Sequence, residues 1–204
     1  MLGQKPLPRK FYMRDPKFVA RDLLGKILVR RLNGHLLEGI IVETEAYYGV
    51  DDPASRAKNS MKKYNAPMWG EVGLAFIYNV HNNWMFNVVA HEPNGIGAVL
   101  IRAIEPLRGI NIMMANRKVH SIINLTNGPG RLTKALKIDK ELNCTDLTDD
   151  KNPIFISNGR FIDEQRIGRT HRIGVSKDLD IELRFYLKDN PFVSKGRIRS
   201  SNQS

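Results

Sequence analysis

Several kinds of signal are missing from this chain of 204 residues, and each absence excludes a class of protein. Cys144 is the single cysteine, so the chain has no internal disulfide and no CxxC metal motif. The five histidines show neither HxH nor HxxxH spacing, so we expect no metal site. No apolar run approaches the roughly 20 residues that span a bilayer, and the first residues lack the apolar core of a signal peptide. These absences predict a soluble intracellular protein.

Negative charge is also scarce. The chain has 32 lysines and arginines against 21 aspartates and glutamates, which gives a formal net charge of +11 at pH 7. Such an excess can simply be a solvated basic surface. It also suits a polyanionic partner, because lysine and arginine neutralise phosphates and release their counterions. The excess therefore favours nucleic acid as the partner but says nothing about chemistry.

Turn signals and apolar periodicity predict a chain that contains both helices and strands. Asp15 and Pro16 are typical of a helix start, and Gly25 of its end. Asn33-Gly34 is a strong hairpin signal, so 26–32 and 35–47 are expected to pair. Strands clustered mid-chain, with helices around them, predict one α+β domain over residues 1–194 and a frayed polar, basic tail over 195–204. Further strands are expected at 74–80, 84–90 and 98–106, which form a meander, and at 172–175 and 182–189. Helices are expected at 108–117 and from Pro129.

The stretch GIIVETEAYYG, residues 39–49, changes from apolar to acidic. In an extended chain side chains alternate, so Glu43, Glu45 and Tyr47 would share the face of Ile41. Both acids can simply face water at a strand end. Alternatively the strand end lines a cleft, where a shielded carboxylate can act as a general base on water and Tyr47 can bind a planar ligand.

Three polar residues interrupt the apolar strands of the meander. Tyr78 and Asn87 need hydrogen-bond partners if their strands are buried. Arg102 lies among apolar residues in AVLIRAIEP, so its guanidinium must point outward or meet a carboxylate, and Glu45 is a candidate.

Six segments together carry a resemblance to a known family. ARDLLGKILVR, IVETEAY, FNVV, VLIRAIEP, NGPGRL and RFYLKDN resemble, in order and spacing, the alkyladenine (3-methyladenine) DNA glycosylases, from about Phe11 to Ser194. The resemblance implies a single mixed domain around a curved antiparallel sheet with a protruding β-hairpin. It also implies a monofunctional base-excision enzyme that flips damaged purines out of double-stranded DNA and hydrolyses the N-glycosidic bond. No metal, no organic cofactor and no membrane are expected, and we expect a monomer in the cytoplasm or nucleoid, or in the nucleus if the source is eukaryotic.

The resemblance also implies roles for the residues around the acidic strand end. Glu45 would deprotonate the attacking water, and Arg102 with the backbone carbonyl near Ile173 would help to hold that water. Departure of a damaged purine leaves an oxocarbenium-like sugar, so a nearby negative charge fits the chemistry. A lyase step would need an amine nucleophile, which these motifs do not supply.

The implied base pocket has two tyrosine walls. Tyr47 and Tyr78 would sandwich the flipped base, because aromatic rings attract an electron-poor alkylated base. Asn87 would crowd the exocyclic amino group of a normal guanine. The chain departs from the family pattern at Arg56, where a histidine is usual, and this puts the lesion preference in question.

A second departure lies at the tip of the hairpin. The family usually has a Tyr-Gly pair there, whose ring fills the gap that the flipped nucleotide leaves. This chain has His81-Asn82, and one residue is missing between Tyr78 and Asn87. Either His81 replaces the wedge or the pair simply forms a tight turn.

Two other classes of function remain open from the residues alone. A non-catalytic RNA- or DNA-binding module would suit the basic charge and leave Glu45 and Arg102 as an accidental pair. A carbohydrate glycosidase would use Glu43 and Glu45 as its acid pair, because same-face neighbours on a strand lie roughly 6.5–7 Å apart. The basic composition fits neutral sugars poorly, so we rank the glycosidase last.

Overall fold

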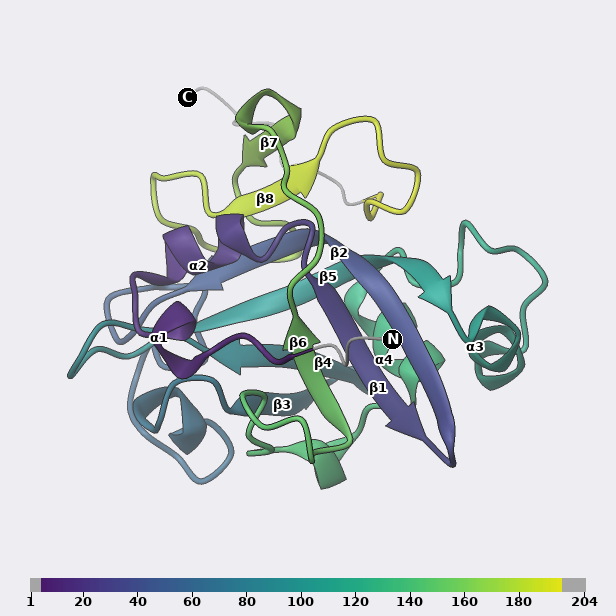
Figure 1. Cartoon of the computed structure of the whole chain (residues 1–204). Coiled ribbons are helices and arrows are strands. Elements are labelled where there is room, and N and C mark those ends of the chain that lie inside the picture. The colour runs from purple at the N-terminus through teal and green to yellow at the C-terminus, as the bar shows by residue number, and fades with distance from the viewer. Residues whose placement is uncertain (1–4, 196–204) are drawn as a thin grey trace.

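The computed structural model describes residues 5–195. The tail expected over 195–204 lies, apart from Lys195, outside the described residues. Within them the chain forms one α+β domain built on a curled antiparallel sheet, as the sequence predicts (Figure 1). Figure 1 shows the long strands crossing the middle of the molecule, α2 above them, α3 to one side and the β7–β8 pair at the top.

Eight strands pair in the described part of the chain, in the order β3-β4-β5-β2-β1-β6, with β8 joining β2 to β7. β2 is the longest, and it pairs first with β1 and then, over Glu43–Glu45, with β8. The acidic end of β2 is therefore enclosed between β5 and β8. The strands are β1 Ile27–Leu32, β2 His35–Tyr47, β3 Ala75–Val80, β4 Asn83–Val89, β5 Ala98–Arg108, β6 Ile154–Ser157, β7 Ile167–Thr170 and β8 Arg184–Leu187.

The predicted helices form close to their expected positions. The Asp15 carboxylate accepts a hydrogen bond from the Lys17 N–H at 2.7 Å, and Pro16 opens α2. Gly25 follows with φ +82°, a conformation that a Cβ would strain. The α-helices are α1 Arg9–Tyr12, α2 Pro16–Asp22, α3 Ile110–Arg117 and α4 Pro129–Leu136, and the 3₁₀ turns are η1 Ala66–Trp69, η2 Lys140–Leu142 and η3 Glu164–Arg166.

Both predicted hairpins close with two residues of positive φ, the pattern of type I′ turns. Asn33 and Gly34 connect β1 to β2 as expected. His81 and Asn82 connect β3 to β4, whereas the sequence suggested a three-residue connection that included Asn83. Asn83 instead pairs with Val80 as the first residue of β4.

The strand predicted at 172–175 is wrong. The segment is a loop, and β7 lies just before it at Ile167–Thr170. The Arg172 N–H donates to the Asp178 carboxylate at 3.0 Å instead of to a neighbouring strand, and Gly174 has φ +75°. These two features turn the chain away from the sheet. Strand β6, only four residues long, was not predicted.

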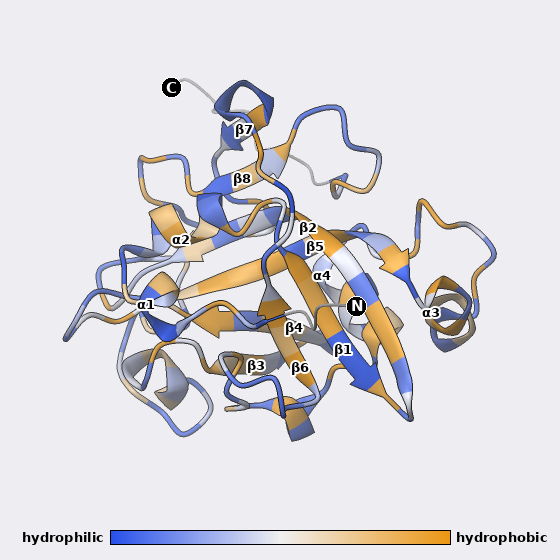
Figure 2. Ribbon diagram, viewed as in Figure 1, coloured by the Kyte–Doolittle hydropathy of each residue, from blue (hydrophilic) through white to orange (hydrophobic). Residues whose placement is uncertain are grey.

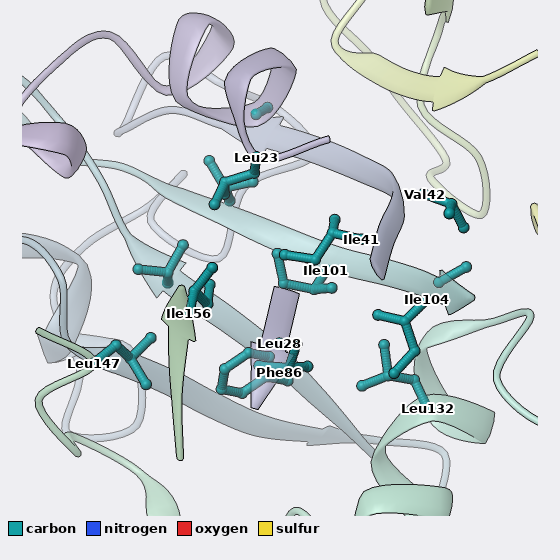
Figure 3. Packing of buried hydrophobic residues seen from close by; sticks show 14 of the residues in the cluster. Leu23, Leu28, Ile41, Val42, Phe86, Ile101, Ile104, Leu132, Leu147 and Ile156 are labelled. Carbon is teal, nitrogen blue, oxygen red and sulfur yellow. The ribbon is translucent and has the colours of Figure 1, made fainter. Parts of the chain in front are cut away.

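The main core lies between the sheet and α2 and α4. Figure 3 shows Leu23, the residue after α2, on the same side as Ile41 and Ile101, and Leu132 of α4 beside Ile104; these side chains have almost no exposed surface. Figure 2 shows hydrophobic residues along most of β5 and in the middle of β2, the strands that cross this core. Burial of these side chains fixes β2 and β5, and with them the residues of the acidic strand end.

The pairing of β2 with β5 is irregular beside the acidic residues. The register shifts between Ile41 and Glu43 and again between Glu43 and Thr44, so Val42 and Arg102 have no opposite residue. Ile41 packs in the core, and Thr44 also points to the core side, where its hydroxyl donates to the Ala20 carbonyl of α2 at 2.8 Å. The expectation that Glu43 and Glu45 share the face of Ile41 is therefore wrong, because the irregularity shifts the alternation by one residue.

Candidate active site

A cavity of about 410 Å³ opens at the acidic end of β2. Its walls come from four strands, from the loop after β2 and from the loop at 173–176. A smaller adjoining pocket shares three of these wall residues and adds Asn87. Of the residues singled out in the sequence, the cavity is lined by Tyr47, Arg56, Tyr78, Arg102 and Ile173, whereas His81 and Asn82 do not line it.

Glu45 lies directly behind this wall, without exposed surface. Its Oε2 accepts hydrogen bonds from the Tyr47 hydroxyl at 2.7 Å and from Arg102 Nη1 at 3.1 Å. Its Oε1 accepts one from the Ile173 N–H at 2.9 Å. The expected contact of Glu45 with Arg102 is confirmed, and Ile173 contributes its N–H to the carboxylate. All three partners line the cavity, and Oε1 keeps a lone pair for a further donor.

Glu43 is bound in a different way. Its Oε1 accepts from Arg102 Nε at 2.9 Å, from Arg184 Nε at 2.8 Å and from the Ser194 hydroxyl at 2.8 Å, and its Oε2 accepts from the Ser194 N–H at 2.7 Å. Burial raises the pKa of Glu43, but the two arginines and the Ser194 hydrogen bonds outweigh it and hold the pKa below its usual value. Glu43 is thus an ionised anchor that fixes Arg102 for its contact with Glu45.

The ring of Tyr47 has a cation on one face. The guanidinium carbon of Arg172 lies 4.6 Å from the ring centroid. Burial and the neighbouring Glu45 carboxylate raise the pKa of the Tyr47 hydroxyl, so it remains a donor to Glu45. Sequence patterns did not single out Arg172 or Arg184; Asp52, which binds Arg172, and Glu43, which binds Arg184, are both distant in the chain.

The ring of Tyr78 faces Arg56. The Arg56 guanidinium carbon lies 4.9 Å from the ring centroid, and both residues line the cavity and the adjoining pocket. Burial raises the pKa of Tyr78, and its contact with Arg56 partly opposes this. Within residues 5–195 no carboxylate pairs with Arg56 and none lines the cavity, so the positive charge of this exposed side chain is uncompensated at the cavity wall.

Asn87 is buried and forms hydrogen bonds within the sheet. Its Nδ2 donates to the carbonyls of Phe76 at 3.0 Å and Met85 at 3.3 Å. Its side chain therefore has a fixed orientation beside Tyr47 and Tyr78 in the smaller pocket. The sequence-based expectation that this amide needs partners is confirmed.

The hairpin tip is exposed and rests on α4. His81 and Asn82 have exposed side chains, and Asn83 packs so closely on Gly130 that a Cβ there would lie 2.7 Å from the Asn83 Oδ1. The Thr133 hydroxyl of α4 donates to the Trp84 carbonyl at 3.0 Å. The tip is thus held beside Pro129, which itself lines the cavity.

The loop from Arg56 to Asn65, here called the rim loop, forms one edge of the cavity. The side chain of Asn65 is buried and closes the loop: its Nδ2 donates to the Arg56 and Ser60 carbonyls at 2.7 and 3.1 Å, and its Oδ1 accepts from the Lys62 N–H at 2.6 Å. Residues 53–70 contain no acid. The exposed side chains of this loop include Arg56, Lys58, Met61, Lys62, Lys63 and Tyr64.

Neither a metal centre nor a membrane helix is found in residues 5–195. No group of three or more His, Cys, Asp or Glu side chains lies in an arrangement that could hold a metal ion there. In the same residues, no helix has the length and apolar character needed to cross a bilayer.

Comparison with known proteins identifies the family of this chain. The model of the methylpurine-DNA glycosylase family matches residues 10–191. A relative from Carboxydothermus hydrogenoformans is 46% identical over 190 residues, which cover 93% of this chain and 98% of that protein. Relatives from Aeropyrum pernix and Prosthecochloris aestuarii are 39% and 42% identical, covering 94% and 92% of this chain and 94% and 90% of their own. All three carry 3-methyladenine DNA glycosylase in their names. On the strength of the family model and these relatives, the chain belongs to the methylpurine-DNA glycosylase family, whose members hydrolyse N-glycosyl bonds in DNA.

Proposed function

We propose that this protein flips damaged purine nucleotides out of duplex DNA and hydrolyses their N-glycosidic bond with a water that Glu45 deprotonates. One observation carries the proposal. A buried carboxylate lies behind the wall of an aromatic-lined cavity, and the three groups that hold it, from Tyr47, Arg102 and Ile173, all line that cavity. The hydrolytic water would bind on the free lone pair of the Glu45 Oε1.

The reaction places positive charge on the sugar as the base departs. The Glu45 carboxylate stabilises this charge and accepts the proton of the attacking water, and the sugar oxocarbenium forms its new C–O bond to that water. Arg102 holds the carboxylate in place, because it bridges Glu43 and Glu45. The electron pair of the broken C–N bond leaves with the base. A cationic base such as 3-methyladenine departs neutral and needs no acid, whereas a neutral base such as hypoxanthine or ethenoadenine departs with a proton taken up from solvent.

The flipped base would lie between Tyr47 and Tyr78. Each ring lines the cavity, and Arg172 covers one face of Tyr47. Arg56 occupies the space beside the Tyr78 ring and would move aside or bind the base edge when the base enters. The rim loop, with four basic side chains and no acid, would bind the phosphates around the flipped nucleotide. Because the proposed substrate is cellular DNA, we propose an intracellular location. We also propose that the protein acts as a monomer.

The carbohydrate glycosidase alternative loses support from Glu43. A general acid must hold a proton at working pH, whereas Glu43 contacts two arginines and its pKa lies below the usual value. The non-catalytic binding module remains the second candidate on charge alone. It predicts binding to DNA without release of a base.

Base release from lesion-bearing duplexes tests the proposal. The protein is incubated with duplexes that contain 3-methyladenine, ethenoadenine or hypoxanthine, and free base and abasic strand are both measured. We expect free base with an intact abasic strand. The lysines of the rim loop are exposed to solvent, and an exposed lysine is not activated as the nucleophile that a lyase step needs. Binding without release would support the non-catalytic module, and a borohydride-trapped adduct would indicate a lyase.

Arg56→His is expected to lower the ratio of ethenoadenine to 3-methyladenine excision about fivefold. The permanent charge of Arg56 repels a cationic base, and two like charges about 4 Å apart in a water-like medium cost about 1 kcal/mol. Single-turnover rates on both lesions measure the ratio. Lys63→Gln, an equally exposed rim-loop residue outside the cavity wall, is the control and should leave the ratio unchanged. An unchanged ratio in Arg56→His would show that this side chain turns away from the base.

His81→Ala is expected to weaken binding to a lesion duplex more than binding to undamaged DNA, if the imidazole fills the gap beside the flipped nucleotide. His81 has φ 47°, which alanine tolerates poorly, so His81→Asn is the cleaner variant because asparagine keeps the turn. His81→Tyr should equal or exceed the wild type. Affinities are measured at one fixed salt concentration. Equal affinities for wild type and His81→Asn would place the wedge elsewhere, with Asn82, Asn83 or Trp84 next.

A further inference from the structure

Arg172 is a buried arginine with every donor used. Its side chain has no exposed surface, and its five N–H groups are matched by five hydrogen bonds. Nη1 and Nη2 donate to the two Asp52 oxygens at 2.6 and 2.7 Å, and Nη1 also donates to the Ala46 carbonyl at 2.9 Å. Nε and Nη2 donate to Asp178 Oδ1 at 2.9 and 2.5 Å. A guanidinium whose donors are all used in this way is held in one position and orientation.

These hydrogen bonds join three segments of the chain at one guanidinium. The Ala46 carbonyl belongs to the end of β2, next to Tyr47. Asp52 lies on the loop after β2, which leads to the rim loop, and it also accepts the Tyr48 and Ala54 N–H groups. Asp178 closes the loop that contains Arg172 itself. One guanidinium therefore sets the relative positions of β2 and two loops of the cavity.

The same residue fixes two groups of the proposed chemistry. Its guanidinium covers the face of Tyr47 at 4.6 Å, which leaves the opposite face for a base. The next residue, Ile173, donates its N–H to the Glu45 carboxylate at 2.9 Å. A shift of the Arg172 loop would therefore move the proposed general base and a stacking wall together.

We infer that Arg172, held between Asp52 and Asp178, is a positioning residue for base excision that couples the Tyr47 wall to the Glu45 carboxylate. The inference rests on the proposed function. The charge of Arg172 is offset by two carboxylates, so it acts through geometry and does not discriminate neutral from cationic bases. Lysine cannot replace it, because an ammonium has three donors and no planar face to lie on the ring.

Arg172→Lys tests this inference against a matched control. We expect its single-turnover rate of base release to fall about 10- to 100-fold, because a displacement of about 1 Å has such effects on reacting groups. Lesion-duplex affinity should change less than about threefold, and the rate should fall by one common factor for 3-methyladenine, ethenoadenine and hypoxanthine. Arg9→Lys is the control. Its guanidinium also bridges several partners, the Val72 carbonyl, Asp146 and Thr148, but lies away from the cavity, so this variant should keep the wild-type rate.

The rates are compared well below the thermal midpoint of each variant. If Arg172→Lys does not fold, Asp178→Asn loosens the same guanidinium while its contact with Asp52 remains, and the same split between rate and affinity is expected. A wild-type rate in either folded variant would overturn the inference, as would an equal rate loss in Arg9→Lys. These outcomes leave the proposed function intact, which fails instead if the wild type releases no base or if Glu45 proves dispensable.

Discussion

Glu45→Gln is expected to lower the rate of base release about a thousandfold while the affinity for a lesion duplex stays within about threefold of the wild type. The carboxamide has the shape of the carboxylate, and its oxygen can still accept the Ile173 N–H. It cannot accept a proton from water, and it provides no negative charge for the sugar cation. Single-turnover assays with saturating enzyme and titrations on the same duplex separate the two effects.

The matched comparison for this prediction is the second acid of the strand. Glu43→Gln makes the same chemical change two residues away but touches no group that lines the cavity except Arg102. We expect it to release base at a rate much closer to that of the wild type. If Glu45→Gln retained a rate within tenfold of the wild type, Glu45 would not be the general base. Near-complete loss in Glu43→Gln alone would reverse the two assignments.

Glu43→Gln has its largest expected effect on stability, a loss of about 3 kcal/mol in the free energy of unfolding. The Glu43 carboxylate has no exposed surface and is the shared partner of Arg102 and Arg184. A neutral amide leaves the buried Arg184 without its carboxylate partner. Chemical denaturation at pH 7 measures the loss. Glu164→Gln, which breaks the exposed pair with Arg169, is the control and should change the free energy by less than about 0.5 kcal/mol.

The same carboxylate makes the stability depend on pH. The pKa values of Glu43 and Asp52 lie below their usual values; burial raises each one, but the arginine contacts and hydrogen bonds outweigh it. Groups of this kind stabilise the folded state above their usual pKa, and the stabilisation is lost as the pH falls through the lowered pKa. The free energy of unfolding should therefore fall between about pH 5 and pH 2, and less steeply in Glu43→Gln. Equal pH slopes for the variant and the wild type would contradict this.

Local signals were sufficient for most of the fold. Asn33-Gly34 and Asp15-Pro16 act through the conformations of a few neighbouring residues, so they could be recognised without tertiary information. The pairing of Glu45 with Arg102 could also be anticipated, since a guanidinium in an apolar strand needs a carboxylate. The loop at 172–175 could not, because the Asp178 carboxylate takes a backbone N–H that a strand would have used.

The finer geometry of the site depends on contacts between distant residues. The register shift at Val42 follows from the pairing of β2 with β5. Alternation within β2 alone therefore placed Ile41 wrongly on the same face as Glu43 and Glu45. The different tasks of Glu43 and Glu45 depend on Arg184 and Ser194, about 140 and 150 positions further along the chain. Two acids with equal local surroundings in the sequence therefore acquire unequal chemistry only in the folded chain.

The closed rim loop has a consequence for how lesion preference can change during evolution. Asn65 holds the backbone of this loop through three hydrogen bonds, and none of them uses a side chain that points into solvent. Substitutions at the outward positions, Lys58, Met61, Lys62 and Tyr64, therefore leave the backbone unchanged and add little ordering cost when DNA binds. The loop can vary as an independent module while the strands that hold Glu45 keep their contacts. New substrate ranges can thus be explored by surface mutation without loss of the hydrolytic chemistry.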